Sequence, residues 1–274
     1  MTTDDTAQDQ RRDAIRHTAS RVPEVTVAFW VTKALTTGMG ESSSDYLVHR
    51  LPPVVAVALG GIALVAALAL QFAARRCVPW TYWLAVAMVG VFGTMAADVL
   101  HVGLGVPYLA STTFFAVALA VIFALWYSFE KTLSIHSIHT TRREVFYWAA
   151  VMTTFALGTA AGDLTAITLH LGYLSSGVMF AIVIAIPALA HWRFGMNAIL
   201  AFWFAYVATR PLGASFADWM GVSHARGGLA LGAGPVSLAL AALIVCFVVY
   251  LSTASTSDHG DPVAAELPEP EGPM

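Results

Sequence analysis

Charge is scarce in this sequence. Of its 274 residues, 11% are charged and 58% are hydrophobic, whereas soluble domains are about 25% charged and about 45–50% apolar. A chain of this composition is not expected to fold in water, and the lipid bilayer is its expected surrounding. No segment indicates a nucleic-acid partner, and the expected ligand is a small solute or an ion.

Cysteines and catalytic motifs are also nearly absent. The two cysteines, Cys77 and Cys246, lack the spacing of a metal site and indicate no disulfide framework. The sequence has no GxSxG, no HExxH, no phosphate-binding loop and no mid-span histidine pair of the kind that binds haem. We therefore expect neither an enzyme nor an evident cofactor. An intramembrane enzyme with Asp and His as acid and base stays open as a weaker alternative.

Long apolar runs dominate the chain instead. Each is long enough to cross a hydrocarbon core of roughly 30 Å as a helix that rises about 1.5 Å per residue. We count eight, near residues 25–48, 53–74, 80–102, 109–130, 144–169, 173–192, 197–219 and 229–252. The sequence predicts an all-α polytopic membrane protein whose transmembrane domain covers residues 23–252.

Two polar tails flank this domain. Residues 1–22 mix both charge signs and lack the apolar region of a signal peptide, and residues 253–274 are acidic, Pro-rich and predicted to be disordered. Ten of the fourteen Lys and Arg lie in the N-terminal tail and in alternate loops. Because basic loops stay in the cytoplasm, we predict a multi-pass protein of the bacterial inner membrane with both termini cytoplasmic.

A repeated motif is the strongest pattern in the chain. Four segments place Gly ten residues after Trp and Asp five residues after Gly: WVTKALTTGMGESSSD, WLAVAMVGVFGTMAAD, WAAVMTTFALGTAAGD and WFAYVATRPLGASFAD. The triplets are Trp30, Gly40, Asp45; Trp83, Gly93, Asp98; Trp148, Gly158, Asp163; and Trp203, Gly213, Asp218. The pattern predicts four tandem two-helix repeats, at about 23–75, 76–135, 141–193 and 196–252.

The Trp and Gly positions have structural interpretations. Trp favours the membrane interface, so each motif Trp is expected to belong to an aromatic belt at the cytoplasmic entry of a span. Each motif Gly has small neighbours, which is typical of places where helix backbones approach closely. Neither position by itself indicates a ligand site.

The aspartates need another explanation, because a carboxylate costs roughly 2.5–3.5 kcal/mol at the centre of a membrane helix. Repeats of two spans share one orientation, so the four aspartates should lie at one depth, toward the extracytoplasmic side, and could face a shared axis. There they could line a polar site for a cation, a proton or a small polar solute. Alternatively, they could cap helix ends or pair with the intramembrane cations Lys33 and Arg210.

The repeats are unequal at the residue after the motif Gly. Glu41 stands there in the first repeat, and the equivalents are Thr94, Thr159 and Ala214. Acidic charge is therefore concentrated in the first repeat. We expect a working centre near Lys33, Glu41 and Asp45, completed by Arg210 from the last repeat.

Histidines follow the aspartates and suggest a metal. His49 and His101 lie four and three residues after Asp45 and Asp98, spacings that put both side chains on one face of a helix. Carboxylate and imidazole ligands suit Mn, Fe or Zn. His49 and His101 are therefore candidate ligands of a divalent metal, with ordinary interfacial histidines as the alternative.

The segments PEVTVAFWVTKALTTGMGESSSDYLV, FGTMAADVLHVGLG and FWFAYVATRPLGASFADW resemble a bacterial family of membrane proteins made of four copies of a repeat of unknown function. The resemblance covers about residues 23 to 222. It implies two membrane spans per repeat and a characteristic Trp. It implies no activity, substrate or catalytic residue.

Two functional hypotheses follow. The first is a small transporter or channel whose site is formed by the four aspartates with Lys33, Glu41 and Arg210. The second is a non-transporting sensor or assembly module in which the aspartates are structural. Carboxylates that face a polar cleft would favour the first hypothesis, and carboxylates bonded to local backbone amides would favour the second.

Overall fold

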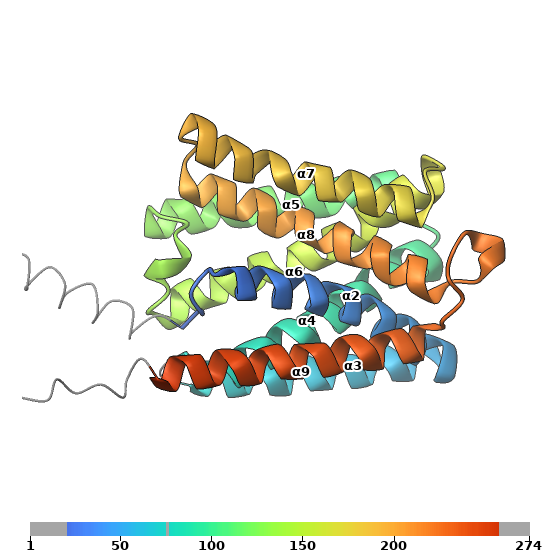
Figure 1. Cartoon of the computed structure of the whole chain (residues 1–274), viewed down its shortest axis with the longest axis horizontal. Helices are drawn as coiled ribbons and strands as arrows, with labels where there is room; N and C mark the ends of the chain where they lie inside the picture. Colours follow the sequence, from blue (N-terminus) through green and yellow to red (C-terminus); the bar gives the residue numbers. More distant parts are fainter. Residues whose placement is uncertain (1–20, 75–76, 258–274) are drawn as a thin grey trace, which may run out of the picture.

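The computed structural model describes residues 21–74 and 77–257, and these residues form helices and loops without any strand. Eight long helices lie side by side along one direction (Figure 1). They are α2 (Val27–Arg50), α3 (Pro53–Ala73), α4 (Pro79–Asp98), α5 (Tyr108–Glu130), α6 (Thr141–Asp163), α7 (Tyr173–Phe194), α8 (Ala198–Gly221) and α9 (Ala233–Ser257). The π-helical turns η1 (Val99–Gly103) and η3 (Leu164–Thr168) extend α4 and α6, and short 3-10 turns η2 (Ile135–Ser137) and η4 (His224–Arg226) lie in loops. The all-α prediction is confirmed.

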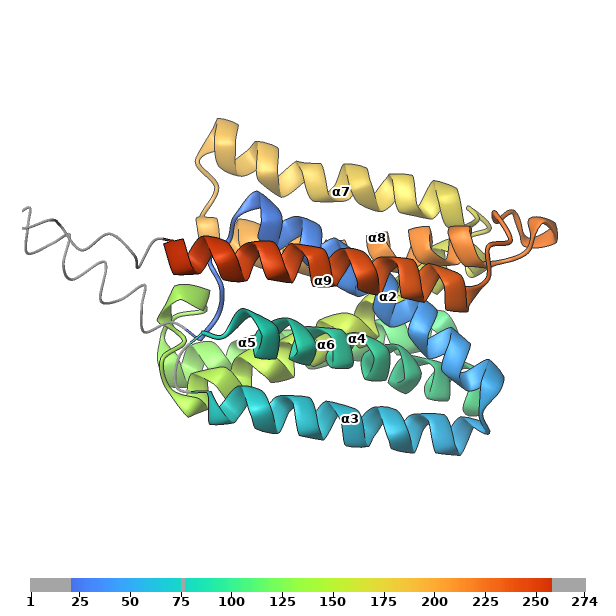
Figure 2. The same cartoon turned by 60° about the horizontal axis from the view of Figure 1, so that its bottom comes forward.

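Within the described residues, seven of these helices are long and apolar enough to cross a membrane. The eighth, α2, is as long as the others but more polar, since it carries Lys33, Glu41 and Asp45. It lies beside α4, α8 and α9 along most of its length, so its polar side chains can face protein (Figures 1 and 2). The chain is a polytopic membrane protein.

The first helices of the four repeats form a closed inner ring. Helix α2 contacts α4, α4 contacts α6, α6 contacts α8, and α8 returns to α2. In α4, α6 and α8, 56–61% of the spanning residues are buried, whereas in the outer helices α3, α5, α7 and α9 only 17–22% are. The inner ring is therefore the core of the molecule, and the outer helices present apolar faces suited to lipid.

Each outer helix packs on the repeat that follows its own. Helix α3 of the first repeat covers α4, α5 covers α6, α7 covers α8, and α9 of the last repeat returns to cover α2. A hydrogen bond of 2.6 Å between the hydroxyls of Ser43 and Ser237 joins α2 to α9. The four repeats thus close into a cycle with approximate fourfold symmetry, which a tandem sequence does not by itself require.

The motif glycines lie where neighbouring inner helices touch, as predicted. A Cβ added to Gly40 would lie 2.7 Å from the backbone of Gly90, closer than real Cβ atoms approach. The same relation recurs around the ring, and the four pairs are Gly40 with Gly90, Gly93 with Phe155, Gly158 with Arg210, and Gly213 with Thr37. Every partner stands seven residues after the motif Trp of the next repeat, so glycine sets the spacing between successive repeats.

The motif tryptophans are also part of this cycle, and the aromatic-belt interpretation is wrong for three of them. Trp83, Trp148 and Trp203 are 1–4% exposed, buried between helices rather than at a lipid-facing surface. The aromatic residue before each Trp packs on the Trp of the next repeat. The ring-centroid distances are 5.4 Å for Phe29–Trp83, 5.7 Å for Tyr82–Trp148, 6.1 Å for Tyr147–Trp203 and 5.6 Å for Phe202–Trp30. The bulky indoles pack between successive inner helices near the end where these helices begin.

The chain enters and leaves the bundle at one end, because α2 begins and α9 finishes on the same side (Figure 1). An even number of spans requires this. Two predicted tail boundaries are wrong: Arg21 and Val22 pack on the bundle, and α9 continues through residues 253–257. Residues 1–20 and 258–274 lie outside the described residues. The assignment of this end to the cytoplasm stays a prediction.

Candidate functional site

Three layers of side chains fill the axis of the inner ring, each layer formed by one repeat position. The residues of the three layers stand three, seven and eleven residues after the motif Trp of their own repeat. Each layer therefore lies about 6 Å further along the axis than the one before it. All twelve residues are buried. The layers are Lys33, Val86, Val151, Tyr206; then Thr37, Gly90, Phe155, Arg210; then Glu41, Thr94, Thr159, Ala214.

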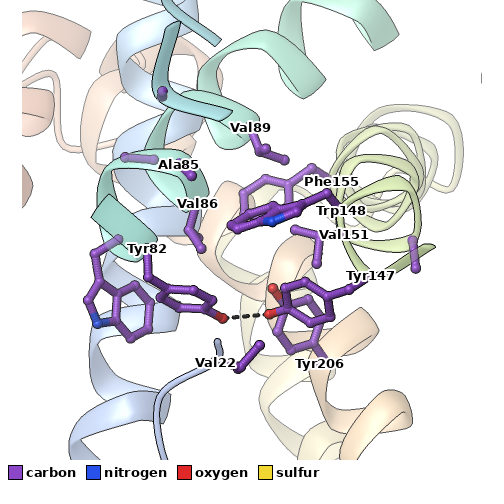
Figure 3. Close-up of a cluster of buried hydrophobic side chains, with 14 of the residues drawn as sticks. Val22, Tyr82, Ala85, Val86, Val89, Tyr147, Trp148, Val151, Phe155 and Tyr206 are labelled. Carbon is purple, nitrogen blue, oxygen red and sulfur yellow. Dashed lines mark hydrogen bonds between the residues drawn. The ribbon is translucent and has the colours of Figure 1, made fainter. Parts of the chain in front are cut away.

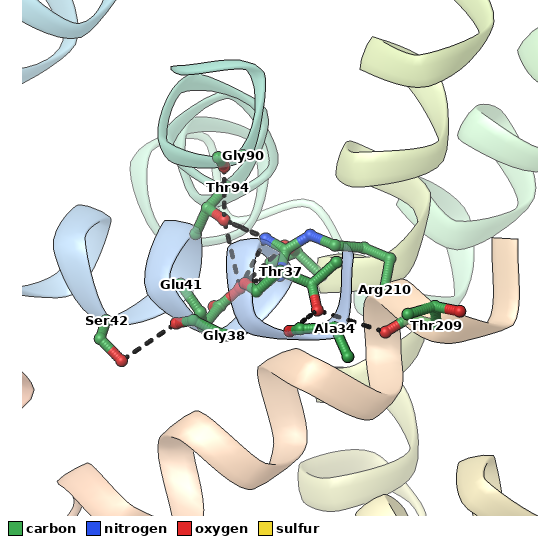
Figure 4. A network of polar contacts seen from close by, with 10 residues as sticks. Ala34, Thr37, Gly38, Glu41, Ser42, Gly90, Thr94, Thr209 and Arg210 are labelled. Carbon is green, nitrogen blue, oxygen red and sulfur yellow. Dashed lines mark hydrogen bonds and ion pairs between the residues drawn. The ribbon is translucent and has the colours of Figure 1, made fainter. Parts of the chain in front are cut away.

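An ion pair occupies the centre of the third layer. Arg210 Nη2 lies 2.8 Å from Glu41 Oε2, and the two side chains are 0% and 6% exposed (Figure 4). Arg210 also donates to the hydroxyls of Thr94 and Thr159 and to the backbone oxygen of Thr37, and both threonine hydroxyls lie within 3.2 Å of Glu41 Oε2. Side chains from all four inner helices therefore meet on the axis.

The sequence explains why Arg210 reaches this position. Ala214 is the fourth member of the layer and provides only a methyl group. Arg210 lies one helical turn before Ala214 on the same face of α8, so its long side chain fills the space left by the alanine. A buried ion pair needs such additional hydrogen bonds to offset the loss of hydration.

Lys33 lies in the first axial layer and has no hydrogen-bond partner among the described residues. Its Nζ atom stands 4.1 Å from the centroid of the Phe155 ring and 4.2 Å from that of Tyr206. Beyond it, the hydroxyls of Tyr82 and Tyr147 form a hydrogen bond of 2.5 Å (Figure 3). This end of the axis is thus closed by aromatic side chains.

The four motif aspartates form what we call the aspartate ring, at the end of the bundle opposite the chain termini. Each stands four residues after the third axial layer, on the same helical face, and each is partly exposed. Asp218 interacts electrostatically with Glu41 and with the other three aspartates, which indicates that the carboxylates are near one another. The members are Asp45, Asp98, Asp163 and Asp218.

The expected caps and charge partners of this ring are not observed. No described residue forms a hydrogen bond or an ion pair with the four carboxylates, and Asp98 and Asp163 precede η1 and η3 without a side-chain cap bond. Arg210 pairs with Glu41 instead, and Lys33 lies three turns deeper. The alternative in which the aspartates pair with Lys33 and Arg210 is not observed among the described residues, because Arg210 pairs with Glu41 and Lys33 lies against the rings of Phe155 and Tyr206.

A cavity of about 340 Å³ opens beside the aspartate ring. Asp45 and Asp218 line it from α2 and α8, together with His49, Arg50 and Arg226. Arg226 is held in place by the hydroxyl of Tyr173. The cavity brings two of the four aspartates together with two arginines and a histidine.

The other two aspartates lie with a histidine. The ligand atoms of Asp98, His101 and Asp163 are all within 4.8 Å of one another. His49 is outside this group: it is exposed, and its Nδ1 atom is 2.6 Å from the backbone oxygen of Asp45. The structure thus separates the two histidines that the sequence suggested together as metal ligands.

A second polar cluster, at the end of the bundle with the chain termini, was not expected from the sequence. Glu144 is 1% exposed and pairs with Arg21, and it also accepts a hydrogen bond of 3.1 Å from Gln71. Trp148 and Thr81 extend this cluster. Because no motif contains Glu144, only its position in an apolar helix could have drawn attention to it. The cluster fastens the N-terminal segment to α6.

The fold and this site define a class of protein: a helical membrane protein whose four tandem repeats close around a polar axis. A family model described as Repeat of Unknown Function (DUF347) matches residues 28–77, 81–132, 146–197 and 201–256. The chain belongs to this family, as its motifs suggested. Neither the curated proteins nor the solved structures gave a match.

Proposed function

We propose that the protein is a small transporter or channel for a cation, a metal ion or a small polar solute, with the aspartate ring as its binding site. One observation carries the proposal: four equivalent carboxylates lie at one depth with no bonded partner among the described residues. Uncompensated acidic groups in a membrane domain are costly and usually functional. Rings of Asp or Glu are typical of cation pathways.

The charge distribution along the axis supports a cation. The aspartate ring and Glu41 together place five acidic groups near the axis, against Arg210 on the axis and Arg226 at the cavity. A cluster of like charges raises the local concentration of ions of the opposite sign. A cation would therefore gather at the ring before it meets the guanidinium below.

The axial layers provide a closed gate for such a path. Below the ring, Arg210 and Glu41 fill the axis with the threonines, and Lys33 and the tyrosines fill it further on. Passage requires Arg210 to leave Glu41, which would expose the carboxylate to the arriving ion. The path then runs through the pseudo-fourfold axis, and transport depends on movement of the last repeat against the first.

Flux into proteoliposomes tests this proposal. Purified full-length protein should take up a monovalent or divalent cation, and the variant Asp45→Asn with Asp98→Asn should abolish uptake while remaining folded. Glu130→Gln is the matched control, because Glu130 is bonded to Arg142 and Arg143 outside the axis and should leave flux unchanged. Unaltered flux in the double variant, or no flux of any ion or small polar solute, would contradict the proposal.

A non-transporting sensor or assembly module is the second candidate. The filled axis favours it, since Arg210 is bonded to Glu41 and to both threonines. In that case the aspartate ring would bind its ligand and change the packing of the outer helices. Ligand-dependent cross-linking without flux would support this candidate over the first.

A further inference from the structure

His101, in the second repeat, has an unusual arrangement of hydrogen bonds. His101 is 8% exposed, and its Nε2 atom lies 2.6 Å from the hydroxyl oxygen of Ser111 on α5. The Ser111 hydroxyl lies 3.0 Å from the backbone oxygen of Tyr108, to which it can donate its single proton. The Ser111 oxygen then accepts a hydrogen bond from Nε2–H of His101. In neutral imidazole this leaves Nδ1 as the unprotonated nitrogen.

That nitrogen has no partner among the described residues. Nδ1 of His101 is buried without a hydrogen bond, and carboxylate oxygens of Asp98 and Asp163 lie within 4.8 Å of each other and of one ring nitrogen of His101. Carboxylates and an unprotonated imidazole nitrogen only accept hydrogen bonds. A buried acceptor left without a donor is costly, so this group lacks an electron-pair acceptor.

We propose that Asp98, His101 and Asp163 bind a first-row divalent cation, of the kind of Mn²⁺, Fe²⁺ or Zn²⁺. This inference rests on the proposed function, because it names the substrate class of the aspartate ring. Two carboxylates and one imidazole suit these ions, whereas Mg²⁺ and Ca²⁺ prefer oxygen alone. Bonds of about 2.0–2.2 Å hold such ligands roughly 3–4 Å apart, so a small movement of the side chains closes the group around one ion.

The local structure is built around this group. Asp98 ends α4, His101 lies in η1 and Asp163 ends α6 next to η3. A π-helical turn widens the helix, and such turns are frequent at functional sites. The hydrogen bond from His101 to Ser111 fixes the orientation of the imidazole, just as most histidine ligands of metals are oriented by a hydrogen bond from their other ring nitrogen. Tyr108 packs on the imidazole with ring centroids 4.5 Å apart.

Three ligands from two helices leave the remaining coordination positions to water, so the ion would be bound but not enclosed. The first repeat offers a matched control with the same residue types. Asp45 and His49 stand four residues apart on α2, but α2 continues without a π-helical turn and His49 is exposed. The proposed site therefore depends on geometry rather than on the presence of Asp and His.

Metal binding to the full-length protein in detergent tests the inference, with Mn²⁺ followed by the loss of its EPR signal and Zn²⁺ by equilibrium dialysis. We expect one ion per chain, at least tenfold weaker binding in His101→Gln and in Asp163→Asn, and wild-type binding in His49→Gln. Ser111→Ala should weaken binding by about 10–100-fold. Mg²⁺ should not compete at equal concentration.

Thermal midpoints without metal show whether each variant is folded. If His101→Gln does not fold, Asp163→Asn tests the site in its place. Absence of a stoichiometric ion in the wild type would overturn the site, and so would equal losses in His49→Gln and His101→Gln. The flux assay separates this inference from the proposed function. Metal binding without flux would support the metal site and contradict the transporter. Flux of another cation without metal binding would contradict the metal site alone.

Discussion

Arg210 and Glu41 come from the last and first repeats and form an ion pair of 2.8 Å between Nη2 and Oε2 on the axis of the inner ring. The pair joins the two ends of a tandem array. It also places Arg210, the largest fully buried charged side chain among the described residues, at the position that any axial path must cross.

Removal of one partner of this ion pair should strongly destabilise the protein. Glu41→Ala leaves a buried guanidinium without its counter-charge, and we expect a loss of about 3–5 kcal/mol in the free energy of unfolding. Titration with SDS in mixed micelles, followed by circular dichroism, measures this quantity. The double variant Glu41→Leu with Arg210→Met should lose much less, because both charges are gone. Equal losses in the single and double variants would show that the pair does not couple the repeats.

Glycine at the contact between successive repeats should be irreplaceable. In Gly158→Ala the new methyl group meets the side chain of Arg210 and lies 3.0 Å from Cδ of Pro211, so we expect a loss of about 1–3 kcal/mol from overpacking. Gly162, one turn later on α6, has neighbours only at 3.8 Å or beyond. Gly162→Ala should be neutral or stabilise the helix by up to about 1 kcal/mol. The same unfolding titration compares the two variants, and similar losses in both would contradict the packing of α6 on α8.

Closure of the repeat cycle can be tested by cross-linking. The hydroxyls of Ser43 on α2 and Ser237 on α9 are 2.6 Å apart, so thiols at these two positions would lie close to the S–S separation of about 2.0 Å in a disulfide. In a background of Cys77→Ala and Cys246→Ala, Ser43→Cys with Ser237→Cys should oxidise to a disulfide. A protease site in the loop between α5 and α6 makes the link visible, because the two fragments stay together on a non-reducing gel.

The control for that experiment is Ser43→Cys with Ser252→Cys. Residue 252 lies fifteen residues further along α9, about 22 Å away along the helix, and this pair should not cross-link. If neither pair forms a disulfide, α9 does not return to α2 and the repeats form an open array.

The thiol of Cys77 should react slowly and with a distinctive pH dependence. Cys77 lies between α3 and α4, outside the spans, and burial raises the pKa of its thiol to about 12. Only the thiolate is nucleophilic. In a Cys246→Ala background, the rate of alkylation should therefore rise about tenfold per pH unit from pH 7 to pH 10, as measured by mass spectrometry.

An ordinary thiol, with a pKa of about 8.5, would level off above pH 9 instead. The unfolded chain provides this reference. A plateau near pH 9 in the folded protein would show that Cys77 is accessible to water.

Much of the architecture could be predicted, because apolar length and a repeat with fixed spacing are properties of the chain itself. Seven of the eight predicted spans meet the criterion of length and hydropathy, and α2 falls below it since its polar residues face the inner ring. The role of Gly40 at a close helix contact was also predictable from its small neighbours. The burial of Trp83 was not, because Trp favours both interfaces and cores.

The sequence predicted which residues form the candidate site, but it did not predict which side chains they contact. Four aspartates at one position fix a shared depth, and the substitution pattern of Glu41, Thr94, Thr159 and Ala214 marks the layer beneath them. The sequence could not show that Arg210 turns toward Glu41, or that Ser111 orients His101. These contacts join residues 169 and 10 positions apart across different helices.

The sequence by itself determined that this protein crosses a membrane, that it is built from four equivalent units, and that each unit carries one carboxylate at the same depth. Apolar length and periodic spacing act locally along the chain, so they are readable without a fold. The tertiary structure alone decided that the repeats close into a cycle, that Arg210 pairs with Glu41 on its axis, and that Asp98 and Asp163 lie close to His101. Those choices depend on which helix faces which, and the packing of glycine, alanine and indole side chains between helices decides that.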